Sequence, residues 1–310
     1  MSRTPRHFRI QMLHITNGHS VALDQTGLPG RIIYWVDALH EGPVPAGLSL
    51  EELSELRAEY LTGFFQKPVS FRERDAAVKG FREHEEVVLW FEHDLYDQLH
   101  LIQLLTWFAR QDVGKTRVSL ICIDQYLGKL RPEQLNKLFP QRHSVSSSES
   151  ETAQTAWDAF SAPEPSGLMA LVESGTEALP FLNGALRRHL EQFPGVRDGV
   201  SRTERQALQF ADSGLHGFGQ MFFADQKLEE RTFMTDATYR QYLRRLREAD
   251  VPLLKENNDG LELTDLGQAV LAGEKDWVAV NGMDRWLGGV HLQEGAPVWR
   301  WDSERGTIST

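Results

Sequence analysis

Acidic, amide and histidine side chains follow each of four short apolar runs in the first half of the chain. Carboxylate oxygens bind hard divalent cations, and a histidine can accept or release a proton near neutral pH. If such side chains meet at one place, they predict a metal site or an acid–base site. In chain order, the polar residues are Asn17, then Asp37, His40 and Glu41, then Glu92, His93, Asp94 and Asp97, and finally Asp124.

The expected metal ligands are Asp37, Glu92 and Asp94, and the expected cation is Mg²⁺ or Mn²⁺. Asp37 and Glu92 open no obvious helix, so a capping role does not account for them. Either Glu41 or His93 is expected to act as a general base. The residues expected to contact a bound ligand are Asn17, Gly18, Ser20, Asp97 and Gln98.

Structural roles compete with these chemical ones. Asp94 and Asp97 have the spacing of the N-cap and N3 residues of a helix. His40 is expected to be a surface or hydrogen-bonded histidine, and His14 a hydrogen-bonded structural one. Cys122 lies inside an apolar run and is expected to be a small core residue.

The apolar runs cover residues 12–16, 31–36, 87–91 and 118–123. Each is nearly continuous in apolar residues, which is typical of strands buried on both faces of a parallel sheet. Helical segments separate the runs, and capping boxes begin at Ser49 and Ser70. Alternating strands and helices predict a Rossmann-like α/β domain, residues 10–143. The polar residues would then share the carboxyl edge of its sheet.

The turn after the first run, Asn17-Gly18-His19-Ser20, is expected to lead into a helix, so its amides and hydroxyl could hold an anion. It is not a P-loop, and the chain contains no G-x-G-x-x-G. The indication of a phosphate site is therefore weak.

A serine-rich stretch, residues 144–150, predicts a domain edge, followed by a helical connector to residue 200. Residues 201–310 are then expected to form a winged helix-turn-helix with an aromatic tail. Its predicted helices cover residues 201–211, 219–228 and 235–249. A hairpin around the Asp259-Gly260 turn and one more helix follow them.

The third of these helices carries Arg240, Arg244 and Arg247 on one face. Such a face could contact DNA, as a recognition helix does, or pair with the protein's own acids. The net charge of −11 favours the second interpretation slightly and argues against non-specific coating of nucleic acid. Winged helices also serve as protein interaction and dimerisation modules, so a homodimer stays open.

Three ordered motifs resemble a bacterial family catalogued as domain of unknown function 1835. They are His14-Ile15-Thr16-Asn17-Gly18-His19-Ser20, then residues 35–45 (WVDALHEGPVP), then residues 89–99 (LWFEHDLYDQL). The resemblance covers about residues 12–135, and the tail at residues 263–291 also resembles the region after that domain in many members. It implies an intracellular bacterial protein but no established activity. In that family an acid often stands where this chain has His19, which argues against a metal role for His19.

The composition is that of an ordinary globular protein, with 310 residues, 41% hydrophobic residues and one cysteine. We expect two domains and a cytoplasmic location. No apolar run approaches the roughly 20 residues of a membrane helix, and the basic start at residues 1–6 lacks the apolar part of a secretory signal.

Two functions remain open on these grounds. The first is a metal-dependent hydrolase or transferase acting on a small phosphorylated or nucleotide-like ligand. The second is a ligand-sensing regulator that responds through the winged helix. Clustered acids favour the first narrowly, because their mutual repulsion costs stability unless a cation binds.

Overall fold

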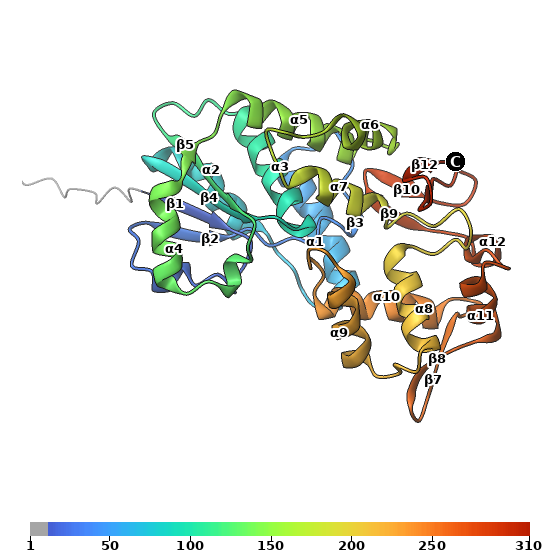
Figure 1. Cartoon of the computed structure of the whole chain (residues 1–310). Coiled ribbons are helices and arrows are strands. Elements are labelled where there is room, and N and C mark those ends of the chain that lie inside the picture. The colour runs from blue at the N-terminus through green and yellow to red at the C-terminus, as the bar shows by residue number, and fades with distance from the viewer. Residues whose placement is uncertain (1–11) are drawn as a thin grey trace, which may run out of the picture.

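The computed structural model describes residues 12–310 and places a five-stranded sheet in the first half of the chain (Figure 1). The strand order is β2-β1-β4-β5-β6. All neighbouring strands are parallel except β5 and β6, so the predicted parallel sheet is in fact mixed. The strands are β1 (Met12–Thr16), β2 (Arg31–Tyr34), β4 (Glu86–Glu92), β5 (Arg117–Ile123) and β6 (His143–Ser144). The α/β class and the mostly parallel sheet are confirmed. The expected lack of a signal at residues 1–6 and the first two residues of the predicted domain lie outside the described residues.

Both faces of this sheet are covered. On β4, Val87, Leu89 and Phe91 join the larger apolar core, while Val88 and Trp90 join a smaller cluster on the other face. The larger core includes residues of α1 (Leu50–Phe65), α2 (Arg72–Lys79), α3 (Leu95–Ala109) and α5 (Ser147–Ser161). The smaller cluster includes residues of α4 (Pro132–Leu138) and of the short 3-10 helices η1 (Leu23–Gln25) and η3 (Leu127–Lys129). Such burial on both sides explains why the strand sequences are apolar throughout rather than alternating.

Of the two capping boxes predicted at Ser49 and Ser70, only the first is present. Ser49 accepts from the amide of Glu52 and completes the capping box of α1. Ser70 does not cap α2, because that helix begins one residue later, after Phe71, with no side-chain cap. The α2 helix is held by its apolar side, where Ala77 and Val78 join the core.

The stretch predicted as a linker, residues 144–150, contains the end of β6 and the first turn of α5. Ser146 accepts from the amide of Glu149 and forms a capping box there, so the stretch opens a helix. The α5 helix packs against α3 and so belongs to the helical layer over the sheet. Two further helices follow, α6 (Ser166–Ser174) and α7 (Leu182–Leu190).

Beyond residue 200, three helices precede a two-stranded hairpin and a further helix, close to the predicted residue ranges. The helices are α8 (Arg202–Asp212), α9 (Phe218–Leu228) and α10 (Asp236–Glu248); the hairpin is β7 (Leu254–Asn257) and β8 (Gly260–Leu263); α11 (Asp265–Ala272) and α12 (Trp277–Asn281) follow. The turn is closed by Asn257, whose side-chain oxygen accepts from the amides of Asp259 and Gly260.

A small sheet that the sequence did not predict joins the two ends of the chain. Its strands are β3 (Gly42–Pro43), β9 (Arg285–Gly288) and β10 (Val290–Leu292), and a separate hairpin pairs β11 (Arg300–Asp302) with β12 (Thr307–Ser309). In the small sheet β3 pairs in parallel with β9. Gly42 is required here, because its φ is 79° and a Cβ would lie 2.1 Å from the ring of Tyr60.

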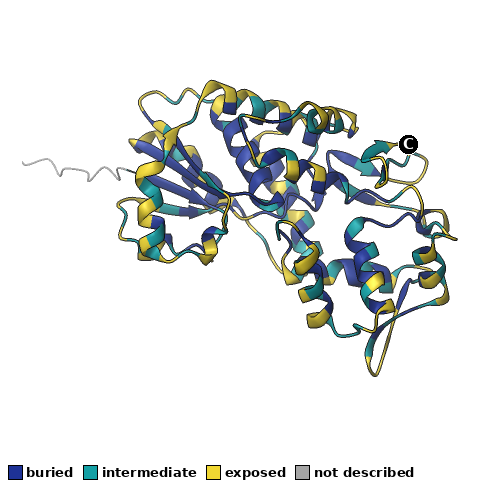
Figure 2. Cartoon of the chain, in the orientation of Figure 1, coloured by how far each residue is buried: buried dark blue, intermediate teal, exposed yellow. Residues whose placement is uncertain are grey.

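The apolar core is continuous between the two halves of the chain. Residues of β1, β4, α3, α7, α8 and α10 all belong to one cluster, and Figure 2 shows buried positions on the facing sides of these elements. Among the described residues, none of the helices combines the length and the apolar character that a bilayer crossing needs.

Candidate metal site at the carboxyl edge of the sheet

The strand order reverses at the carboxyl ends of β1 and β4. The chain runs from β1 to β2 on one side, and then crosses to β4 on the other side of β1. Ligands of open α/β sheets bind at such a reversal, outside the carboxyl ends of the strands. Asn17 directly follows β1, and Glu92 is the last residue of β4, so both stand at this position.

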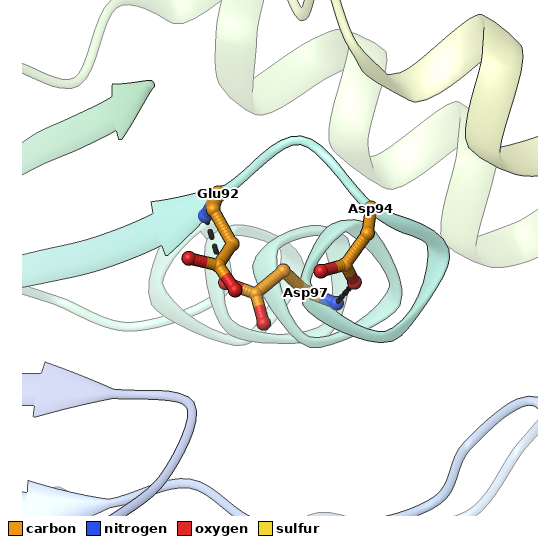
Figure 3. A group of neighbouring side chains, drawn as sticks. All are labelled: Glu92, Asp94 and Asp97. Atoms are coloured by element: carbon orange, nitrogen blue, oxygen red, sulfur yellow. Dashed lines mark hydrogen bonds between the residues drawn. The ribbon is translucent and has the colours of Figure 1, made fainter. Parts of the chain in front are cut away.

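Three carboxylates meet at this reversal point (Figure 3). Glu92 comes from the end of β4, Asp94 is the N-cap of α3, and Asp97 lies in the first turn of that helix. One oxygen from each lies within 4.8 Å of the others. Their residues are only 5, 4 and 0% exposed. This group is called the acidic triad below.

Amide groups, and not cations, hold the acidic triad in place. Asn17 Nδ2 donates to Asp97 Oδ1 at 2.5 Å and to Glu92 Oε1 at 3.3 Å. The backbone amide of Glu92 donates to Asp97 Oδ2 at 2.7 Å, and the amide of Asp97 to Asp94 Oδ1 at 3.0 Å. The amide of Leu127 donates to Glu92 Oε2. Within residues 12–310 no lysine or arginine forms an ion pair with the triad.

Burial makes the ionised forms of these acids costly. It raises the pKa of Asp94 to about 7, and it also raises the pKa of Glu92 and of Asp97. The negative charges of the neighbouring triad members raise the pKa of Asp94 and Asp97 further. The Glu92 and Asp94 carboxylates lie within hydrogen-bond reach of each other, so they need a shared proton or a cation between them.

The donor set suits a hard divalent cation. Three carboxylates supply oxygen ligands, and Asn17 Oδ1 is a further buried oxygen that has no hydrogen-bond partner among the described residues. Oxygen-only sites with several carboxylates select Mg²⁺, Mn²⁺ or Ca²⁺ over softer metals. The structure therefore offers one buried acidic group that could hold a metal ion.

Asp37, an expected ligand, lies outside this group. Its carboxylate is bound by Arg57, with Nη2 at 2.7 Å and Nε at 3.1 Å from Oδ1, and both residues are buried. The charge of Asp37 is thus already neutralised, and Asp97 occupies the place expected for it. The spacing of Asp94 and Asp97 could have indicated this, because an N-cap and an N3 side chain both face the start of one helix.

Glu41, an expected general base, is also engaged elsewhere. Tyr242 of α10 donates its hydroxyl to Glu41 Oε1, and Arg285 of β9 lies 3.5 Å from the same oxygen. Arg57 donates to the backbone carbonyl of Glu41 at 2.5 Å. These contacts tie the loop before β3 to the last third of the chain, and none of them involves the acidic triad.

His93, the other expected base, lies between Glu92 and Asp94 in the sequence, and its ring contacts Tyr126 and Phe181. Its Nε2 lies 3.9 Å from the exposed carboxylate of Asp124, and the contact with Tyr126 is edge-on at 4.7 Å. Burial, and then the charge of Arg231, lower the pKa of His93. The imidazole is therefore neutral at pH 7 and free to accept a proton.

A segment that sequence reasoning missed covers these strand ends. It is the connection between α9 and α10, residues 229–235. Arg231 donates to the carbonyl of His93 at 3.4 Å and lies 3.5 Å from Asp124. Thr232 donates its amide and its hydroxyl to the Tyr126 hydroxyl at 2.6 and 2.8 Å. No local pattern indicates these contacts, because they join residues more than one hundred positions apart.

The expected ligand loop is only partly at the site. Asn17 contacts the triad, whereas Ser20 is exposed and Gly18 lies in the same turn. The expected helix after this turn is wrong, since only the three-residue η1 follows and leaves no helix N-terminus for an anion. Gln98 Nε2 donates to the carbonyl of Glu92 at 2.6 Å, so it supports the end of β4.

Two histidine predictions have opposite outcomes. His14 is confirmed as structural, since it accepts from Trp90 Nε1 at 3.1 Å and contacts the carbonyl of Pro29 at 3.3 Å. His40 is neither exposed nor hydrogen-bonded in the described structure. It packs against Phe233 at 5.2 Å, and burial lowers its pKa to about 3.

The arginine face of α10 is occupied by contacts within the same part of the chain. Arg247 pairs with Glu256 at 2.6 Å and with Glu248 at 3.0 Å, and Arg244 lies 3.7 Å from Glu248. Arg240 stacks on the ring of Phe218 at 3.7 Å. This agrees with pairing to the protein's own acids, although these acids come from residues 248–256 and not from the first domain.

Comparison with known proteins does not place the chain. No family model matches it, and no curated protein does either. The resemblance of residues 12–135 to domain of unknown function 1835 therefore stays a prediction.

Proposed function

We propose that the protein binds a divalent cation, Mg²⁺ or Mn²⁺, at Glu92, Asp94 and Asp97. There it would bind and process a small phosphorylated or nucleotide-like ligand, as a hydrolase or a transferase. The observation that carries this proposal is a group of three buried carboxylates without a cationic partner at the reversal point of the sheet. A bound cation would remove the cost of holding these charges together.

The chain's own residues have separable tasks in this proposal. The triad would hold the cation, and a bound cation would supply positive charge to polarise a phosphoryl oxygen. Asn17 fixes the carboxylates of Glu92 and Asp97 relative to each other. His93, the chain neighbour of Glu92 and Asp94, would accept the proton of the attacking group. The segment 229–235 limits the access of water.

The first test measures Mn²⁺ binding to the protein by calorimetry and by thermal unfolding. Glu92→Gln is expected to weaken binding at least about tenfold, since it removes one charged ligand. At 100 times the dissociation constant, Mn²⁺ should stabilise the wild-type protein by about 2.7 kcal/mol and the variant far less.

Glu86→Gln is the matched control. Glu86 begins the strand that Glu92 ends and is equally buried, but it is paired with Arg117 and Arg142. Burial acts to raise its pKa, yet hydrogen bonds from Arg142, Arg117 and Ser119 lower it to about 2. This variant should lose stability and keep Mn²⁺ affinity. Equal affinity in wild type and Glu92→Gln would exclude the metal site.

A second candidate is a regulator that acts through residues 201–272. We infer a winged helix there from three helices, a hairpin and a following helix in that order. Since Arg244 and Arg247 are paired with acids, we expect any affinity for duplex DNA to be weak. Fluorescence anisotropy with labelled duplex DNA tests this. Tight binding that Arg240→Glu abolishes would favour the regulator over the enzyme.

A further inference from the structure

A cavity of about 900 Å³ opens beside the edge strand β2, and no residue of the acidic triad lines it. Its walls are β2, the connection between α1 and α2, and the first turn of α10. Small-molecule sites have volumes of roughly 300–1,000 Å³. The cavity is therefore large enough for a ligand of nucleotide size.

Four aromatic rings belong to the lining. They belong to Tyr34 on β2, to Phe65 and Phe71 at the two ends of the α1–α2 connection, and to Tyr96 at the start of α3. Flat rings of this kind take up a planar ring by stacking, with little preference for its substituents. A planar heterocycle fits such walls better than a sugar or an alkyl chain does.

Charges of both signs line the same cavity. Arg31 and Lys67 are exposed and form no ion pair among the described residues, and the same holds for Glu73 and Asp236. A lining that offers both donors and acceptors matches the edge of a nucleobase, which presents both. A purely anionic ligand would instead require an excess of cations.

The cavity shares two chain segments with the acidic triad. His19 packs against Tyr34 in the wall of the cavity, with 3.9 Å between the ring centres. Two residues earlier in the chain, Asn17 donates to Glu92 and Asp97. Tyr96 lines the cavity from the same helical turn that carries Asp94 and Asp97. Each segment thus meets the triad through one residue and the cavity through another.

We propose that this cavity holds the base of a nucleotide whose phosphate extends toward the cation at the acidic triad. The inference rests on the proposed function and names its substrate class. The ring would stack among Tyr34, Phe71 and Tyr96, and its polar edge would meet the charged groups of the rim.

The test compares AMP with ribose 5-phosphate, which carries the same phosphate without the base. Calorimetric titrations in the presence of Mn²⁺ should show AMP binding at least about tenfold tighter, since a stacked base contributes roughly 1–3 kcal/mol. Tyr34→Ala should weaken AMP binding about tenfold and leave ribose 5-phosphate unaffected. Phe223→Ala, on the exposed side of α9, is the aromatic control.

A pair of charge reversals tests the inference independently, in case Tyr34→Ala does not fold. Lys67→Glu alters an exposed residue of the rim, and Lys115→Glu makes the same change at an exposed residue outside the lining. Only Lys67→Glu should weaken AMP binding. Equal affinities for AMP and ribose 5-phosphate, or equal effects of both reversals, would overturn the inference.

The two proposals fail in different ways. In one outcome, Glu92→Gln binds AMP as tightly as the wild-type protein does, with or without Mn²⁺, and Tyr34→Ala still weakens AMP binding. This outcome supports the cavity as a base site and excludes the metal function. If Mn²⁺ binds at the triad but AMP affinity ignores Tyr34 and Lys67, the cavity proposal is overturned and the metal site stands.

Discussion

Glu86 and Glu92 stand at the two ends of β4 and show how the surroundings of a buried acid decide its role. Both are glutamates with almost no exposed surface. Two arginines bind Glu86, which therefore stays ionised and stabilises the sheet. Glu92 accepts hydrogen bonds only from amides and has two acidic neighbours. A bound cation would therefore stabilise its ionised form.

The sequence could not show which of Asp37 and Asp97 joins the acidic triad, because the partners of a buried acid come from distant parts of the chain. Asp37 follows a strand without opening a helix, which favoured it as a ligand. Its partner Arg57 comes from α1, and nothing in the spacing shows that the two side chains meet. Asp97 was predicted to contact a ligand, and its position at a helix start concealed that its carboxylate lies close to those of Glu92 and Asp94.

Two buried tyrosines of α10 offer a comparison at single-residue resolution. Tyr242 donates to Glu41 and accepts from Arg285 and Gln192. Tyr242→Phe should lower the free energy of unfolding by about 2 kcal/mol, because it removes the donor to Glu41 and the acceptor of Arg285 and Gln192 in a buried network. Urea denaturation measures the loss.

Tyr239→Phe is the control for this substitution. The Tyr239 hydroxyl is buried and has no hydrogen-bond partner among the described residues. Removing it should change the free energy of unfolding by less than about 0.5 kcal/mol, or raise it slightly. Equal losses in the two variants would show that the contact with Glu41 contributes nothing.

At the scale of helices and strands, local patterns predicted most elements and missed those made by distant pairing. The four long strands, α1, α3 and the three helices after residue 200 follow from apolar periodicity and capping residues. The strands β3, β6 and β9 were not predicted. They have two to four residues each, and pairing with a distant segment defines them.

The two serine positions near helix starts make a test of capping at this scale. Ser146→Ala should lower the free energy of unfolding by about 1 kcal/mol, because Ser146 caps α5. Ser70→Ala should have almost no effect, since α2 begins after Phe71 and has no side-chain cap. Thermal unfolding of both variants measures this. A larger loss for Ser70→Ala would mean that α2 begins one residue earlier.

At the scale of the whole molecule, buried polar groups lie where the sheet domain meets the last third of the chain. His40, His100 and His189 are each at most 1% exposed, and burial lowers the pKa of each to about 3. Arg188 and Arg285 lie near them, and their charges act in the same direction on His40 and His189. These histidines are therefore neutral in the folded protein.

This arrangement predicts loss of stability in mild acid. The unfolded chain binds protons at these histidines near pH 6.5, whereas the folded protein does so only near pH 3. The stability they confer is complete above pH 6.5 and is lost as the pH falls toward 3. Together they should lower the free energy of unfolding by about 4 kcal/mol for each pH unit in that window.

A histidine variant separates the contribution of the histidines to the pH dependence of stability from that of the buried acids. The raised pKa values of Asp225 and Asp94, each about 7, and the raised pKa of Asp97 act in the opposite sense and favour lower pH. His100→Gln should therefore reduce the slope of stability against pH by about 1.4 kcal/mol per unit relative to wild type. Urea midpoints at several values between pH 5 and 7 measure the slopes. Identical slopes would contradict neutral burial of His100.

The pairing of β3 with β9 has a consequence for biosynthesis. Gly42 pairs with Leu287, so the partner of β3 is translated about 245 residues later. At roughly 5–20 residues per second, the delay on the ribosome is on the order of 12–50 s. During this time Glu41 lacks Tyr242 and Arg285, and the edge of β3 has no strand beside it. The nascent chain would hold its sheet domain with an unpaired β3 edge until β9 has been synthesised, and a chaperone could bind this edge during that period.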